Sequence, residues 1–231
     1  MTTRNDSDDI DAHSFTWRVL RKEEAPVAHA VHIEALSGQA AGLVRPDELS
    51  HFMRHMGEEG LLVGCFIADG QMVAYGVLGT ASKTVSHMAE LLEIDEADHS
   101  RFCVLDGVAA LTAWRGYGMH RESIKERLRH AGQLGHTLVG ATVAPGNIPS
   151  MRGLFEARFQ VKKFSMLYGG LSRLVLKKDL KVAEPDWVLQ HRVAATDEPG
   201  HQSALKEGLT GFGCSQREDG VWQVHYGIEK R

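Results

Sequence analysis

The sequence predicts a mixed α+β fold, an α/β chain with a central mixed sheet flanked by helices. Two observations predict it. Segments with apolar residues three and four positions apart, typical of helices, alternate along the chain with β-prone runs. Several β-prone runs are paired around Asp69-Gly70 or Gly169-Gly170, dipeptides that suit the positive φ angles of tight hairpin turns. A chain in which helices alternate with hairpins forms a sheet of mixed direction.

Length and composition limit the classes of protein that fit. The chain has 231 residues, 43% of them hydrophobic, which is enough for one sizeable core. Lys and Arg number 26 against 30 Asp and Glu, giving a net charge of −4 that excludes a generally basic nucleic-acid binder. No apolar stretch approaches the roughly 20 residues of a membrane span. We therefore expect neither nucleic acid nor a membrane as a partner.

The cysteines and the ends of the chain bear on compartment and domain organisation. Cys65, Cys103 and Cys214 are far apart and form no CxxC pair, which favours a reducing, cytoplasmic environment. Residues 1–13 are acidic and predict a disordered tail. Residues 14–180 form the predicted main domain. Residues 181–231 predict an appendage of a strand, a helix and a hairpin packed on the same domain, and no internal repeat of fixed period is evident.

Each element of the main domain follows from its own pattern. The expected helices are 23–36, 46–56, a short one at 85–92 inside a polar insertion, one that ends near Gly135, and 148–158. The expected strands are 15–20, 61–68, 71–78, 102–111, 137–143, 159–168 and 171–178.

A glycine-containing turn joins the apolar strand 102–111 to the helix that follows. Its sequence, Ala113 to His120, reads AWRGYGMH. Glycines there let backbone N–H groups converge at the positive end of the helix dipole, an arrangement that binds phosphate. The glycines could equally serve a plain tight connection. Neither the dinucleotide fingerprint nor the P-loop pattern is matched.

In its context this turn resembles motif A of the GNAT family, the Gcn5-related N-acetyltransferases. Arg115 and Gly118 match the motif, and His120 replaces its last small residue. Downstream, the segment from Asn147 to Phe159 resembles motif B of the same family, with Arg158 in the place of the usual glycine. The resemblance covers about residues 15–180 and implies the GNAT acyl-CoA N-acyltransferase fold.

The resemblance implies acetyl-CoA, or coenzyme A after transfer, as the co-substrate. The pyrophosphate would lie over the turn, and the pantetheine arm would pair with the backbone of strand 102–111. Three backbone N–H groups near the end of that strand would stabilise the oxyanion. The cofactor-binding residues implied are Arg115, Gly116, Tyr117, Gly118, Met119, His120, Asn147, Ser150 and Phe155, together with Ala109, Ala110 and Leu111 for the oxyanion.

Two residues are candidates for proton transfer. Asp106 is the one carboxylate inside the predicted central strand, where burial would raise its pKa and make it a better base; alternatively it caps local N–H groups. The family's general acid is a tyrosine at the position of Phe155, which cannot donate a proton. Tyr168 is the nearest later candidate, with filling of the sheet as its alternative role.

The sequence thus indicates a GNAT-type acetyltransferase, an enzyme of EC class 2.3.1, in which an amine attacks the thioester directly in a ternary complex. The acceptor, a small-molecule or peptide amine, is not identified, and a homodimer is left open. A non-catalytic acyl-CoA-binding module is the alternative. His51 and His55 lie four residues apart, but no third ligand is evident, so we interpret them as surface histidines and expect no metal site.

Overall fold

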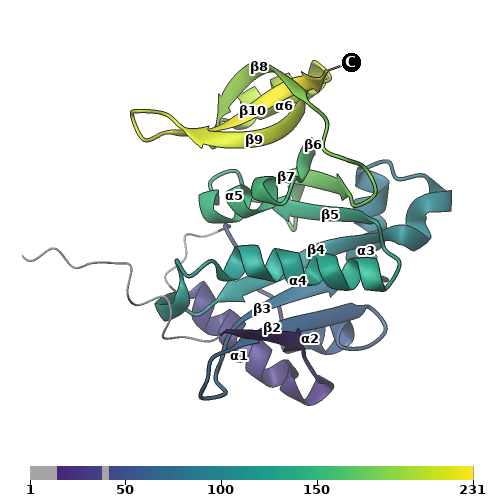
Figure 1. The fold of residues 1–231 in the computed structure, drawn as a ribbon, viewed down its shortest axis with the longest axis vertical. Helices are drawn as coiled ribbons and strands as arrows, with labels where there is room; N and C mark the ends of the chain where they lie inside the picture. The colour runs from purple at the N-terminus through teal and green to yellow at the C-terminus, as the bar shows by residue number, and fades with distance from the viewer. Residues whose placement is uncertain (1–14, 38–41, 231) are drawn as a thin grey trace, which may run out of the picture.

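The computed structural model describes residues 15–37 and 42–230, and their strands form one ten-stranded sheet (Figure 1). The sheet order is β1-β2-β3-β4-β5-β7-β6-β9-β10-β8. The strands are β1 Thr16–Val19, β2 Gly60–Phe66, β3 Met72–Gly79, β4 Phe102–Ala110, β5 Leu138–Val143, β6 Gln160–Leu167, β7 Leu171–Asp179, β8 Trp187–Ala194, β9 Thr210–Gln216 and β10 Trp222–Glu229. The helices are α1 Ala25–Leu36, α2 Leu49–His55, α3 Lys83–Leu91, α4 Met119–Gln133, α5 Ile148–Glu156 and α6 Glu198–Lys206, with 3-10 turns η2 Lys22–Glu24, η3 Glu96–Arg101 and η4 Thr112–Trp114.

This architecture confirms the predicted mixed fold, and most element boundaries agree within a few residues. The largest shift is at α2, which was expected to start at Pro46 and starts at Leu49. The backbone N–H of Asp47 donates to Nε2 of His32 at 2.9 Å, which holds the preceding segment outside the helix. The predicted tail at 1–13 lies outside the described residues.

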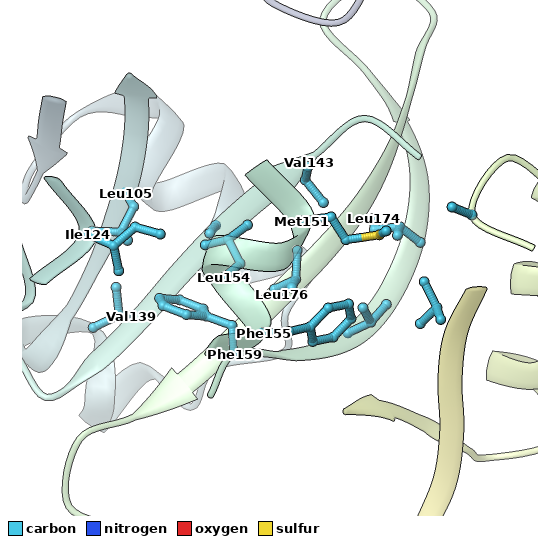
Figure 2. Close-up of a cluster of buried hydrophobic side chains, with 14 of the residues drawn as sticks. Leu105, Ile124, Val139, Val143, Met151, Leu154, Phe155, Phe159, Leu174 and Leu176 are labelled. Atoms are coloured by element: carbon cyan, nitrogen blue, oxygen red, sulfur yellow. The ribbon is translucent and has the colours of Figure 1, made fainter. Parts of the chain in front are cut away.

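Helices cover both faces of the sheet. On one face α4, α5 and α6 share a core cluster with the central strands, in which Ile124, Met151 and Phe159 are at most 1% exposed (Figure 2). On the other face α1 and α2 pack around Phe52 and Tyr75, and α3 forms a third cluster. Burial of these apolar side chains is the main stabilising contribution to the fold.

Strands β4 and β5 are parallel and separate part-way along their length. Their pairing runs from Phe102 opposite Leu138 to Leu105 opposite Ala141 and then stops, although β4 continues to Ala110. Its register against β3 also shifts at this point, because Asp106 and Gly107 together lie opposite one residue of β3. Such a bulge bends a strand and redirects its side chains. A cleft therefore opens between β4 and β5, beginning at Asp106.

The last four elements form a second unit with the same order as an earlier one. Strand-helix-hairpin β5-α5-β6-β7 is followed by β8-α6-β9-β10, and the two units meet where β6 pairs with β9, Val161 lying opposite Gly211. Asn147 and Asp197 cap the two helices, and Arg158 and Gly208, with φ of 65° and 81°, end them. The structure thus contains a repeated unit that the sequence analysis did not detect, because few side chains are shared between the copies.

Candidate active site

The glycine-containing turn has the backbone geometry expected of a phosphate cradle. Gly116 and Gly118 have φ of 90° and 75°, values that glycine adopts without strain. Gly118 is the N-cap of α4, which begins at Met119. The first N–H groups of a helix have no partner within it, and they lie at the positive end of its dipole. Arg115 lies beside the turn, and its Nη2 donates to the carbonyl of Ala35 at 2.8 Å, which anchors the turn to α1.

His120 does not occupy the cradle with its side chain. Its Nε2 is 3.2 Å from Oγ of Ser150, and a Cβ on Gly153 would lie 2.6 Å from its Nδ1, so the ring packs against α5. Burial lowers the pKa of His120 to about 3. The side chain of Met119 is also turned into the core. These residues can therefore reach a cofactor only through their backbone.

A cavity of about 90 Å³ lies in the cleft between β4 and β5. It brings together four residues that the sequence analysis selected separately. These are Asp106, Asn147, Ser150 and Tyr168. The remaining lining comes from residues that the sequence did not indicate, including His32, Arg45, Asp47, Tyr75, Thr142 and Arg173. A small cavity lined by polar side chains in a cleft between two strands is suited to hold a reacting group.

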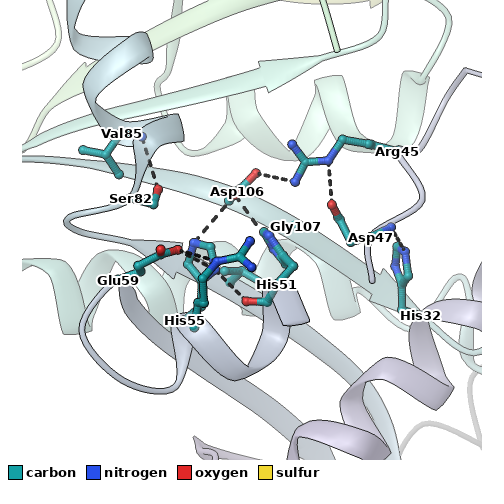
Figure 3. Close-up of polar contacts among 12 residues, drawn as sticks. His32, Arg45, Asp47, His51, His55, Glu59, Ser82, Val85, Asp106 and Gly107 are labelled. Atoms are coloured by element: carbon teal, nitrogen blue, oxygen red, sulfur yellow. Dashed lines mark hydrogen bonds and ion pairs between the residues drawn. The ribbon is translucent and has the colours of Figure 1, made fainter. Parts of the chain in front are cut away.

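Asp106 lies at the bulge, and its two oxygens face different partners (Figure 3). Oδ1 is 3.7 Å from Nη2 of Arg45, whose Nε pairs with Asp47 at 2.6 Å. Oδ2 is 3.8 Å from Nε2 of His55 and 3.9 Å from Nε2 of His51. Oδ2 is buried and has no hydrogen-bond partner among the described residues. The alternative role, capping of local N–H groups, is therefore not observed there.

The burial of His51 and His55 contradicts the interpretation as surface histidines. The two side chains are 9% and 1% exposed, because α2 packs its histidine face against β4 at the bulge. Only the i, i+4 spacing hinted at this arrangement in the sequence. Their partner Asp106 lies about 50 residues further along the chain and could not be paired with them from spacing.

Two of the three backbone N–H groups predicted to stabilise the oxyanion are wrong, because they point toward β3. The N–H of Leu111 donates to the carbonyl of Val73 at 2.9 Å and is not available to a thioester. Successive N–H groups of a strand point to opposite sides, so the N–H of Ala109, opposite Tyr75, points toward β3 as well. The N–H of Ala110 points the other way, toward the side from which β5 has diverged. Of the three predicted donors, Ala110 alone has a suitable direction.

Tyr168 lines the same cavity as Asp106 and is held there by its neighbours. Its hydroxyl is 3.3 Å from Oγ1 of Thr142, and the guanidinium of Arg45 lies 4.8 Å from the ring centroid. Its φ of 53° belongs to the turn that joins β6 to β7, in which Gly169 and Gly170 also have positive φ. Burial raises the pKa of Tyr168, so the phenol keeps its proton at neutral pH.

Phe155 is placed differently from its predicted cofactor role. It is 6% exposed, belongs to the core cluster under α5, and does not line the cavity (Figure 2). Asn147 does line the cavity, but its Oδ1 accepts a hydrogen bond from the N–H of Ser150 at 3.3 Å and caps α5. Its amide NH₂ is the part that remains for a ligand.

Arg127 supports the bulge from the opposite face of the sheet. It is 1% exposed, and its Nη1 donates to the carbonyls of Val77 and Gly107 at 3.1 and 3.3 Å. Both carbonyls belong to the irregular part of the β3–β4 pairing. Burial lowers the pKa of Arg127 to about 10, and the nearby charge of Asp106 opposes that effect. Arg127 stands among charged residues in the sequence, a pattern typical of a solvated helix face, yet it is buried.

Comparison with known proteins gives similarity at the level of structure. No protein-family model matches the sequence, and no curated protein matches it. Among solved structures, an N-acetyltransferase from Staphylococcus aureus Mu50 superposes with a TM-score of 0.55 at 13% identity, covering 73% of this chain and 99% of its own. A GCN5-related N-acetyltransferase from Kribbella flavida does so with a TM-score of 0.55 at 15% identity, covering 72% and 98%.

A third structure was solved with a cofactor. The yncA protein of Salmonella typhimurium, whose structure contains acetyl-CoA, has a TM-score of 0.55 at 16% identity and covers 75% of this chain and 98% of its own. At these identities the likeness shows the fold. Roughly a quarter of this chain lies outside each match. In the described part of the chain, no helix combines the length and the apolar character of a membrane span.

Proposed function

We propose, from the premise that this chain has the GNAT acyltransferase fold, that it is an N-acetyltransferase that moves an acetyl group from acetyl-CoA to an amine. The observation that carries the proposal is the position of the bulge. It places Asp106 at the mouth of the β4–β5 cleft, with Tyr168 lining the same cavity and the cradle at the end of the same strand. The structural neighbours described as N-acetyltransferases support the same reaction.

Different residues have different roles in the proposed reaction. The N–H groups at the start of α4 would hold the pyrophosphate, and the outward N–H of Ala110 would stabilise the oxyanion that forms when the amine attacks the thioester. Asp106 takes the proton that the amine must lose. Tyr168 donates a proton to the departing thiolate, in place of the tyrosine that Phe155 replaces. Direct attack in a ternary complex needs no acyl-enzyme intermediate.

In this proposal the acceptor approaches Asp106 on the α1–α2 side of the sheet, where Arg45 and Asp47 line the cavity. Arg45 and Asp47 stand at this entrance beside His32, which lies between the N–H of Asp47 and the hydroxyl of Tyr75. The entrance therefore offers charges of both signs. We propose a small-molecule or peptide amine as the acceptor class.

Release of the coenzyme thiol from acetyl-CoA across a panel of polyamines, aminoglycosides and peptide N-termini tests the proposal. We expect release with at least one class of amine, and a loss of about 100-fold or more in kcat for Asp106→Asn. Asp219→Asn, in the distant β9–β10 hairpin, is the matched control and should leave kcat unchanged. Tight binding of acetyl-CoA without release for any amine would instead identify a non-catalytic acyl-CoA-binding module.

A further inference from the structure

Three buried polar atoms converge between α2 and β4 without any hydrogen-bond partner among the described residues. They are Nε2 of His51, Nε2 of His55 and Oδ2 of Asp106 (Figure 3). The ligand atoms of these three residues lie within 4.8 Å of one another, and the side chains are 9%, 1% and 7% exposed. Buried polar atoms are normally satisfied, so three orphans at one place call for a missing partner. We propose that these residues form a binding site for a divalent transition-metal ion, Zn²⁺ in the first instance.

The proton on His55 is fixed by its surroundings. Its Nδ1 is 2.9 Å from the carbonyl oxygen of His51, which can only accept, so Nδ1 carries the hydrogen. In the neutral ring Nε2 then presents a lone pair, and it faces Oδ2 of Asp106, another acceptor, at 3.8 Å. A proton shared between them would draw the atoms to hydrogen-bond distance. A histidine that donates from one nitrogen to a backbone carbonyl and offers the other as a ligand is typical of metal sites.

The spacing and distances suit zinc. His51 and His55 are four residues apart on one face of α2, as in helical zinc motifs, and β4 supplies the third ligand. Two ligand atoms around a tetrahedral zinc ion, each about 2.0–2.2 Å from the metal, lie about 3.4 Å apart. The distances of 3.8 and 3.9 Å from Oδ2 to the two histidines exceed this by a few tenths of an ångström. The three ligand atoms lie within 4.8 Å of one another, so movements of the two histidine rings toward the ion would close the site.

The surrounding charges leave room for a cation. Arg45, 3.7 Å from Asp106 Oδ1, and Arg127, behind the bulge, oppose a metal ion. Asp47 pairs with Arg45 at 2.6 Å, and Glu59 lies 4.0 Å from Nδ1 of His55. Glu59 also pairs with the more exposed Arg54 at 3.3 Å. Around the three ligands, the three carboxylates thus match the three guanidinium groups in number, and no excess of positive charge excludes an ion.

The ligand set also selects among ions. Two imidazole nitrogens and one carboxylate oxygen suit Zn²⁺ and neighbouring transition metals better than Ca²⁺ or Mg²⁺, which prefer oxygen ligands. An ion on Oδ2 would lower the basicity of the whole Asp106 carboxylate. Metal loading and acetyl transfer through Asp106 are therefore expected to oppose one another.

Metal titration of the full chain, stripped with a chelator, tests the proposal without any assay of acetyl transfer. Co²⁺ is the probe for visible absorption, and Zn²⁺ is the probe for calorimetry. We expect one equivalent of tightly bound ion, and an affinity at least about 100-fold weaker for His55→Gln, which keeps the size of the side chain. His87→Ala, which removes an exposed histidine on α3, is the matched control and should bind as the wild type does.

A gain-of-affinity variant keeps the test decisive if His55→Gln folds poorly. Arg45→Gln removes the opposing cation nearest to Asp106, and we expect it to tighten Zn²⁺ binding about fivefold to tenfold. Wild-type protein that binds less than a stoichiometric amount of Co²⁺ at millimolar concentration would overturn the proposal. So would equal affinities of the wild type and His55→Gln.

Discussion

At the scale of single residues, the proposed mechanism divides proton transfer between Asp106 and Tyr168, which line one cavity and differ in chemistry. Burial raises the pKa of Tyr168, so the phenol stays protonated at neutral pH and is available as a general acid. A thiolate that departs without a donor must be protonated by water, which is slower. The residue at which the family has its tyrosine, Phe155, is buried in the core and cannot take part.

Tyr168→Phe tests this division. We expect kcat to fall about 100-fold, because general acid catalysis typically contributes that much, while the KM for acetyl-CoA stays within about twofold. Tyr226→Phe removes another buried hydroxyl, hydrogen-bonded to His201 at 2.9 Å and distant from the cavity, and should leave kcat unaltered. Steady-state kinetics on both variants make the comparison. An unaltered kcat in Tyr168→Phe would remove it as the acid.

His120 makes stability depend on pH. Its pKa is about 3 in the folded chain and about 6.5 when unfolded, so the unfolded state binds the proton more tightly. The contribution of His120 to the free energy of unfolding is complete above pH 6.5 and is lost as the pH falls from 6.5 toward 3. For this one group the free energy of unfolding should drop by about 2 kcal/mol between pH 7 and pH 5.

Urea unfolding at pH 7 and pH 5 measures this effect. His120→Gln cannot titrate, so its loss of stability between the two pH values should be about 2 kcal/mol smaller than that of the wild type. Only the losses of stability between pH 7 and pH 5 are compared, so a change in the absolute stability of His120→Gln does not affect the result. Parallel losses in the two proteins would show that His120 is not the buried group responsible.

How well the site residues could be predicted depends on whether a local sequence pattern or the packing of distant segments determines their contacts. The sequence selected Asp106 as the one carboxylate of its strand, Tyr168 as the nearest later tyrosine, and Asn147 and Ser150 from the motif resemblance, and the structure brings all four to one cavity. The sequence did not pair His51 and His55 with Asp106, since that contact depends on how α2 packs against β4 and no local pattern encodes it. The assignment of Leu111 as a donor was wrong because the direction of an N–H depends on strand register.

At the scale of elements, the β4 bulge depends on α4. An apolar run such as Phe102–Ala110 predicts a strand but contains no sign of a bulge. Arg127 supplies the hydrogen bonds to Val77 and Gly107 at this point, and β3 accommodates it by having no side chain at Gly76, where a Cβ would lie 2.8 Å from its Nε. The irregularity therefore arises from a contact between segments about 20 to 50 residues apart.

Arg127→Met should destabilise the protein by about 2–4 kcal/mol, because it leaves two buried carbonyls without a donor. It should also weaken acetyl-CoA binding, since β4 would lose the support of its bulge. Arg129→Met, on the exposed face of the same helix and paired with Glu126, is the control and should cost less than about 1 kcal/mol. Urea unfolding measures both. A cost equal to that of the control would mean that the bulge does not depend on Arg127.

At the scale of the whole molecule, the second strand-helix-hairpin unit extends the sheet beyond β6. The same turn closes α5 and α6: Phe159 donates to the carbonyl of Leu154 at 3.0 Å, and Leu209 to that of Ala204 at 3.1 Å. The two units thus share the same local capping although their side chains differ. The sequence predicted the elements of this unit, but its position depends on the pairing of β6 with β9, which no local signal specifies.

The junction between the units depends on one glycine. A Cβ at Gly211 would lie 2.8 Å from Cβ of Val161, so Gly211→Val should force β9 away from β6 and cost about 1–3 kcal/mol. A Cβ at Gly213, two residues further along the same strand, would lie 3.7 Å from its nearest neighbouring atom, so Gly213→Val should be tolerated better. Thermal unfolding of the two variants measures the difference. Equal stabilities would show that the units are not packed tightly at this glycine.

The affinity for acetyl-CoA of Gly118→Asp, measured by calorimetry beside Gly135→Asp, tests the central claim most directly. Both glycines have positive φ, 75° and 86°, and stand just outside the two ends of α4, so the strain of substitution is matched. We predict that aspartate at the cradle raises the Kd about 100-fold or more, because its charge repels the pyrophosphate, and that Gly135→Asp binds as the wild type does. Equal affinities for the two variants would contradict the assignment of the cradle.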